Sequence, residues 1–75
     1  MLRFSGTEDD ARLEARKTAE SNGWGFAFYR QCGYDRVLDY PRWVVTSSPL
    51  AYGEDASDWV RVFASTHPLY DADQS

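Results

Sequence analysis

Small residues recur at four-residue intervals near the N-terminus, which is the spacing of one face of an amphipathic helix. They are Ala11, Ala15 and Ala19. Thr7 stands just before this stretch and Asp10 follows three residues later, a spacing that approximates a capping box. Gly23 in "SNG" suits the left-handed residue that follows a helix. We therefore predict a helix over residues 8–21 that rests its small-residue face on a sheet.

The pattern then changes to two-residue alternation, which is typical of strands. In "WGFAFYRQC" one face would carry Trp24, Phe26 and Phe28. The other face would carry Ala27 and Tyr29. This alternation predicts a strand at about 24–32, and "CGYD" after it predicts a turn because Gly33 tolerates positive φ. A second strand is predicted at about 36–47, where Pro41 requires an edge position or a bulge because proline cannot donate within a sheet.

Residues 58–66 fit two patterns. As a strand, one face would carry Val60, Val62 and Ala64. As a helix, one face would carry Trp59, Val62, Phe63 and Thr66. Because β-branched and aromatic residues favour strands, we predict a third strand at about 58–65.

The predicted fold class is α+β, with the helix at 8–21 packed on a three-stranded antiparallel sheet in the order α-β-β-β and with open sheet edges. Leu2 and Phe4 alternate with Arg3, so a brief additional strand is possible at the N-terminus. A chain of 75 residues predicts a single domain, 1–75, in which residues 67–75 form a loosely held tail.

Composition limits how such a domain is stabilised and where it works. The single cysteine, Cys32, allows no intrachain disulfide and fits a reducing compartment. Twelve aromatic residues therefore have to supply much of the core. Residues 1–10 lack the apolar segment of a signal peptide, and no apolar run approaches the roughly 20 residues of a membrane span. Because seven of the eight basic residues are arginine, which suggests a GC-rich bacterial or phage coding sequence, we expect the bacterial cytoplasm.

Acidic residues gather in clusters within a chain of net charge −4. One cluster is Glu8, Asp9 and Asp10, and another is Glu54, Asp55 and Asp58, flanked by Tyr52 and Trp59. A third is Asp71 and Asp73. Two interpretations stay open for residues 54–58: a polar loop whose acids cap the next element, or carboxylates that imitate a phosphate backbone and occupy a basic groove. The second interpretation predicts a protein partner with a basic nucleic-acid-binding surface, and neither nucleic acid nor a membrane as a direct partner.

No residue pattern predicts an enzyme. His67 follows the last predicted strand without a predicted pocket, and Cys32 has no neighbouring histidine to lower its pKa. The spacing of "EDASD" does not match a calcium loop, and one histidine with one cysteine does not make a zinc site of the Cys/His kind. We therefore predict no catalytic residues, no cofactor and no metal.

As a whole, this short acidic chain that starts at Met1 and carries no catalytic set resembles the small phage-encoded anti-CRISPR proteins, especially their acidic members. The resemblance implies a protein that binds a CRISPR effector and blocks its binding or cleavage of DNA. In that case Glu54, Asp55 and Asp58 would meet arginine and lysine side chains of the effector. Tyr52 and Trp59 would be desolvated anchors, and the acids at 8–10 would extend the contact.

The alternative is a small accessory or self-associating domain that pairs through a sheet edge or exposed aromatic side chains. An edge-paired dimer would show a mass that depends on concentration. Of the two oligomeric states, we expect the monomer rather than the homodimer.

Overall fold

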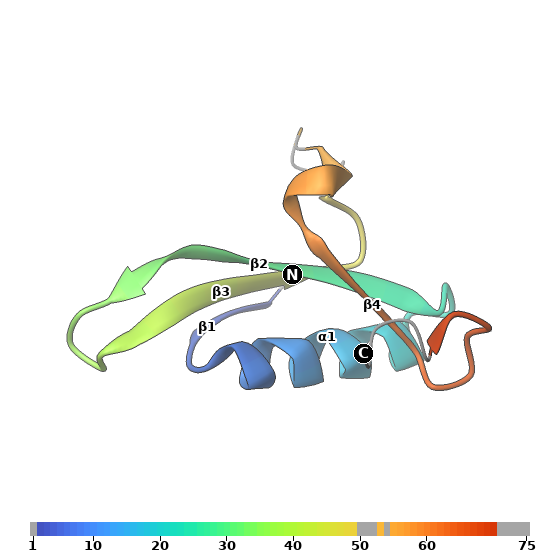
Figure 1. The fold of residues 1–75 in the computed structure, drawn as a ribbon, viewed down its shortest axis with the longest axis horizontal. Coiled ribbons are helices and arrows are strands. Elements are labelled where there is room, and N and C mark those ends of the chain that lie inside the picture. The colour runs from blue at the N-terminus through green and yellow to red at the C-terminus, as the bar shows by residue number, and fades with distance from the viewer. Residues whose placement is uncertain (1, 50–52, 54, 71–75) are drawn as a thin grey trace.

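The computed structural model describes residues 2–49, 53 and 55–70, which form one four-stranded antiparallel sheet with one long helix against it (Figure 1). The elements in chain order are β1 (Leu2–Ser5), α1 (Glu8–Ser21), β2 (Phe26–Asp35), β3 (Tyr40–Thr46), the short 3₁₀ helix η2 (Ala56–Asp58) and β4 (Val60–Phe63). The strand order across the sheet is β1-β3-β2-β4. The predicted α+β class is confirmed.

The predicted count of three strands is wrong, because β1 adds a fourth. Leu2 lies opposite Val45, and Ser5 lies opposite Arg42, so the whole of β1 pairs with β3. Four residues give too little alternation to identify a strand with certainty, and β1 depends on the neighbouring strand for its hydrogen bonds. The order is therefore β-α-β-β-β. The third predicted strand is confirmed as a strand rather than a helix, although β4 is shorter than predicted.

Local hydrogen bonds define both ends of α1, as predicted. The Thr7 hydroxyl accepts a bond from the Asp10 amide at 3.2 Å, and Asp10 Oδ2 accepts one from the Thr7 amide at 3.0 Å. Asn22 caps the C-terminal end by donating its amide to the Thr18 carbonyl, and Gly23 follows with a φ of 81°. The helix thus begins and ends where side chains satisfy the backbone groups that a helix leaves unpaired.

The turn predicted at residues 32–35 is wrong, because β2 continues to Asp35 and the chain reverses after it. The register between β2 and β3 shifts between Gln31 and Gly33, and Gly33 has a φ of 151°. The glycine therefore serves a β-bulge and not a turn. Pro41 lies opposite Tyr34 and just past the last pair of β1 and β3, where its carbonyl accepts a hydrogen bond from the Gly6 amide at 3.0 Å. The proline fits at this end of the β1–β3 ladder because it can accept a hydrogen bond although it cannot donate one.

Two connections cross the sheet, and they use opposite faces. β1 and β2 are parallel with β3 between them, and β3 and β4 are parallel with β2 between them. Each link must therefore pass over the intervening strand. Both connections, β1 to β2 and β3 to β4, move two strands across the sheet in the same direction. They start from antiparallel strands, because β1 and β3 run in opposite directions. If both crossovers are right-handed, they therefore lie on opposite faces of the sheet. Figure 1 shows α1 on one face, the helix face, and η2 of the crossover loop (47–59) on the other, the loop face.

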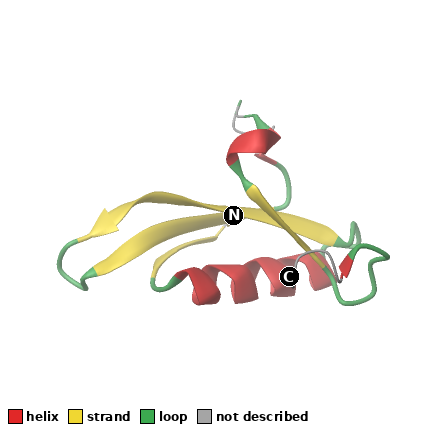
Figure 2. Cartoon of the chain, in the orientation of Figure 1, coloured by secondary structure: helices red, strands yellow, loops and turns green. Residues whose placement is uncertain are grey.

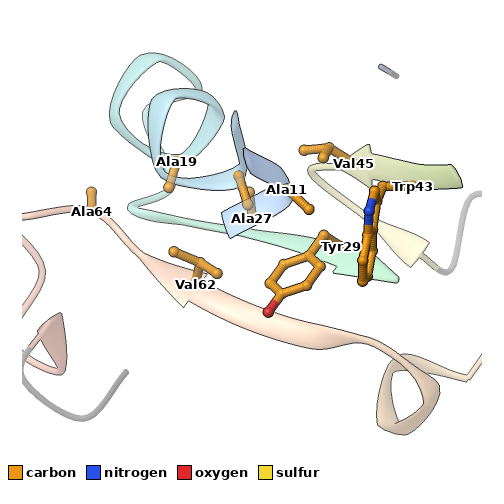
Figure 3. Packing of buried hydrophobic residues seen from close by; sticks show 9 residues of the cluster. Ala11, Ala19, Ala27, Tyr29, Trp43, Val45, Val62 and Ala64 are labelled. Atoms are coloured by element: carbon orange, nitrogen blue, oxygen red, sulfur yellow. The ribbon is translucent and has the colours of Figure 1, made fainter. Parts of the chain in front are cut away.

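The main core lies between α1 and the helix face (Figure 3). Its fully buried large side chains are Tyr29, Val45 and Val62. Ala11, Ala15 and Ala19 are the buried residues of the helix, as the spacing predicts. Their small side chains allow the helix backbone to approach the sheet closely. Trp43 completes this core and donates its indole N–H to the Gly6 carbonyl at 2.9 Å, so its only polar atom is satisfied.

A second, smaller cluster lies on the loop face. It contains Phe28, Val44 and Trp59, with Phe26 packed against it. The predicted alternation of aromatic side chains along the first strand is therefore confirmed for Phe26 and Phe28. They lie on the loop face of β2, and Ala27 and Tyr29 lie on its helix face. Trp24, by contrast, is 59% exposed, although its ring lies 6.2 Å from that of Phe26.

Candidate functional site

The acids at the start of α1 have intramolecular roles. Asp10 belongs to the capping box, and Glu8 Oε2 accepts a hydrogen bond from the Tyr29 hydroxyl at 2.9 Å. Burial, and then this bond, raise the pKa of Tyr29 to about 12. Asp9 is exposed in the first helical turn. At these positions negative charge also interacts favourably with the helix dipole. The first acidic cluster thus stabilises α1 and joins it to the sheet.

In the crossover loop, Asp55 caps η2. Its Oδ1 accepts a bond from the Ser57 amide at 3.0 Å, and its carbonyl accepts one from the Asp58 amide at 3.1 Å. Both Asp55 and Asp58 are exposed. Glu54 and Tyr52 lie outside the described residues. Capping by Asp55 agrees with the first interpretation of the cluster, while the exposure of both carboxylates leaves them accessible to a partner.

Trp59 holds the crossover loop onto the sheet. Only 7% of this residue is exposed, and its ring packs with Phe28 and Val44. The Arg30 guanidinium lies 5.0 Å from the ring centroid on the same face. Within the described part of the chain, the indole N–H has no hydrogen-bond partner. The structure therefore places Trp59 beneath the loop, with little surface left for contact with a partner.

The two described acidic clusters do not meet. The first belongs to α1 on the helix face, while Asp55 and Asp58 belong to the loop that stands out from the opposite face (Figure 2). One flat partner surface cannot contact both clusters, because the sheet lies between them. The third cluster, Asp71 and Asp73, lies outside the described residues.

The two faces of the sheet differ in charge, and the net charge of the whole chain does not show this difference. The register places four arginines on the loop face, namely Arg3, Arg30, Arg42 and Arg61. The guanidinium of Arg61 lies 4.9 Å from the Phe63 ring centroid. The strand residues of the helix face carry no charged side chain. Strand alternation alone produces this separation, so the acidic crossover loop stands over an arginine-bearing sheet.

The tip of the β2–β3 hairpin is a feature that the sequence analysis missed. Val37 is 92% exposed and Leu38 is 59% exposed. The Tyr34 hydroxyl donates to Asp39 Oδ1 at 2.6 Å, and this bond raises the pKa of Tyr34. Asp39 adopts a φ of 59°. The sequence signal for this tip was the aliphatic pair Val37 and Leu38 between the charged residues of "DRVLD". The pair was assigned to the second predicted strand, at about 36–47.

A groove between β1 and α1 is a second such feature. It has a volume of about 420 Å³ and is lined by Leu2, Phe4, Ser5, Asp10, Leu13 and Glu14. Leu13 is 53% exposed because it lies off the alanine face of the helix. Leu13 therefore forms one wall of the groove. The groove thus combines aliphatic side chains with two carboxylates.

His67 and Cys32 are the single histidine and the single cysteine of the chain. The His67 ring stacks on Phe63 with 4.6 Å between centroids, and His67 Nδ1 accepts a bond from the Leu69 amide at 3.0 Å. Cys32 is an exposed thiol at the bulge. Over the described ranges, no three His, Cys, Asp or Glu side chains are grouped so that they could hold a metal ion.

Comparisons with known proteins give no relative. No family model matches the chain, and neither a curated protein nor a solved structure is significantly similar to it. No helix in the described part of the chain is long and apolar enough to cross a membrane.

Proposed function

We propose that the protein is a small binding protein that inhibits a bacterial nucleic-acid-handling defence complex of the CRISPR effector class. In this proposal the crossover loop enters a basic DNA-binding surface of the effector. The observation that carries the proposal is the position of Asp55 and Asp58, which are exposed on a loop that stands out from the sheet (Figure 1). Carboxylates on a projecting loop can reach arginine and lysine side chains that line a groove.

In this proposal the contact lies on the loop face. Glu8 and Asp10 are engaged within the chain and lie with α1 on the other face, so they are not part of the contact. Trp59 supports the loop from below, and the buried ring keeps the acidic segment in position. The contact therefore depends on Asp55 and Asp58, with Glu54 and Tyr52 next to them in the sequence.

The experiment measures binding of labelled target DNA by a panel of purified, guide-loaded CRISPR effectors, with and without the protein. The loop variant combines Asp55→Asn, which removes the charge but keeps the oxygen that caps η2, with Asp58→Lys. We expect this variant to raise the inhibitory concentration at least about ten-fold, which corresponds to about 1.4 kcal/mol. The matched control is Asp9→Lys, which changes an exposed acid on the helix face and should inhibit as the wild type does.

Binding of the protein to DNA alone is measured in the same assay, because four arginines share the loop face. Direct binding to the labelled DNA would attribute the inhibition to these arginines. Equal inhibition by the loop variant, the control and the wild type would exclude the acidic loop as the inhibitory element. If no effector of the panel is inhibited, the inhibitor proposal fails.

The second candidate is a self-associating domain. Two exposed apolar surfaces on one small chain favour it, namely the hairpin tip and the groove between β1 and α1. Exposed aliphatic patches of this kind are typical of contact surfaces between proteins.

A further inference from the structure

The last described segment of the chain, residues 64–70, is fastened to the C-terminal half of α1, and we call it the strap. Figure 1 shows it curving back beyond β4 beside the end of that helix. Glu20 Oε1 accepts hydrogen bonds from the Ser65 amide at 3.2 Å and from the Ser65 hydroxyl at 2.6 Å. The Arg16 guanidinium lies 4.5 Å from the centroid of the Tyr70 ring. Contacts with α1 therefore hold the strap near both of its ends.

His67, at the centre of the strap, packs against the sheet. Its ring stacks on that of Phe63, with 4.6 Å between the centroids and 30° between the planes. It also lies directly on Gly25, where a β-carbon would come within 2.9 Å of His67 Cδ2. Phe63 pairs with Phe26, which belongs to the cluster on the loop face. The His67 ring thus covers an aromatic part of the loop face.

The hydrogen bond that orders the turn of the strap requires an unprotonated nitrogen. His67 Nδ1 accepts a bond from the Leu69 amide at 3.0 Å, and the His67 carbonyl accepts one from the Tyr70 amide at 3.0 Å. Pro68 lies between these residues, and its fixed φ favours such a turn. Because Nδ1 is an acceptor, the neutral ring carries its hydrogen on Nε2. A proton on Nδ1 removes the acceptor and sets two N–H donors against each other.

We propose that the strap is a pH-sensitive closure, in which neutral His67 keeps it on the Phe63 ring and a proton taken up by Nδ1 from solvent releases residues 67–70. Histidine side chains change charge between about pH 5 and 8. Release uncovers Phe63 beside Phe26, whose ring lies 6.2 Å from that of the exposed Trp24. The acid form therefore presents a larger aromatic surface. The inference goes beyond the proposed inhibitor function and does not rest on it, because it concerns the free chain.

Three charged side chains lie around the strap. From β4, the Arg61 guanidinium lies 4.9 Å from the centroid of the aromatic ring on which the histidine stacks. From α1 come Arg16 and Glu20, and residues 24–26 before β2 carry no titratable side chain. Both arginines stay charged, and the hydrogen bonds from Ser65 hold the pKa of Glu20 below its usual value of 4.5. Of these groups, only the imidazole changes charge between about pH 5 and 8.

The test follows hydrogen exchange of the backbone amides of the purified full chain by NMR between about pH 5 and 8, with the His67 ring titration recorded in the same samples. Exchange rates are corrected for their intrinsic dependence on pH. The protection of the Leu69 and Tyr70 amides is expected to fall at least about three-fold as the ring takes up its proton, because one hydrogen bond is lost. The amide of Val45, in the core, should keep its protection.

Two variants separate the acceptor from the aromatic contact. His67→Asn keeps a side-chain oxygen that can accept from the amide two residues on and that does not titrate, so the Leu69 amide should be protected equally at both ends of the pH range. His67→Phe keeps a ring on Phe63 but has no acceptor, so the same amide should be unprotected at every pH. Circular dichroism and urea unfolding verify that both variants fold.

The proposal is overturned if the Leu69 and Tyr70 amides keep their protection while the His67 ring of the wild type titrates. It is also overturned if His67→Asn loses protection in acid as the wild type does, because the responsible group would then be another one. A parallel loss at Val45 would assign the change to unfolding of the whole domain, which contradicts a local closure.

Discussion

Removing the Tyr29 hydroxyl tests whether its hydrogen bond to Glu8 couples α1 to the sheet. The ring is fully buried on β2 and lies edge-on to Trp43, with centroids 5.8 Å apart. The hydroxyl reaches the helix, where it donates to Glu8 Oε2 at 2.9 Å. Tyr29→Phe keeps the ring and removes only this bond, so it isolates the polar link between the two layers.

The contribution of the Tyr29 hydroxyl to the free energy of unfolding differs between neutral and alkaline pH. A hydrogen bond to a charged group contributes about 1.5–3 kcal/mol, and we expect the lower end because water can solvate the exposed Glu8 in the variant. Burial and the bond to Glu8 raise the pKa of Tyr29 from 10.0 to about 12. The folded state thus favours the protonated phenol, whose contribution is complete below pH 10 and is lost as the pH rises through about 12. The difference between the two pKa values corresponds to at most about 2.7 kcal/mol.

The assay is urea unfolding of the wild type and Tyr29→Phe between about pH 7 and pH 12, with tyrosinate absorbance followed in parallel. At neutral pH the variant should be about 1.5 kcal/mol less stable than the wild type. Above about pH 10 the difference should shrink and then reverse, because only the wild type loses stability by ionising Tyr29. A difference that stays constant over the whole range would refute the reasoning.

Three further predictions concern the helix and the hairpin. Thr7→Ala removes the cap of α1 and should lower the unfolding free energy by about 1 kcal/mol in urea, whereas Thr7→Ser should leave it nearly unchanged. Ala15→Leu overfills the fully buried contact between α1 and the sheet and should destabilise by about 1–3 kcal/mol, measured in the same way; full stability would mean that the helix can move away from the sheet. Backbone hydrogen bonds, first that from Leu38, lower the pKa of Asp35 from 3.8. The stability that they provide is therefore present above this value and lost as the pH falls below it, so Asp35→Ala should unfold with a weaker acid dependence than the wild type.

The helix was predictable because its signals are local. The alanine spacing, the pair Thr7 and Asp10, and the glycine at residue 23 all act within a few residues of the backbone groups that they serve. The faces of the first strand were predictable for a similar reason, since alternation needs no knowledge of the partner strand.

The hairpin was not predictable from the same kind of signal. Gly33 looked like a turn residue, but only the register with β3 decides that it belongs to a bulge and that the chain reverses after Asp35. For that reason Val37 and Leu38 were assigned to a strand, and in the structure they are the exposed tip.

The sequence by itself determined the α+β class, the limits of α1 and the clustering of acids at residues 8–10 and 54–58. Only the tertiary structure decided what those clusters can do. The two crossover connections start from antiparallel strands and move across the sheet in the same direction. They therefore lie on opposite faces of the sheet. That geometry separates the acids of α1 from those of the crossover loop, and no local pattern in the chain encodes it, because it depends on how four strands are ordered in space.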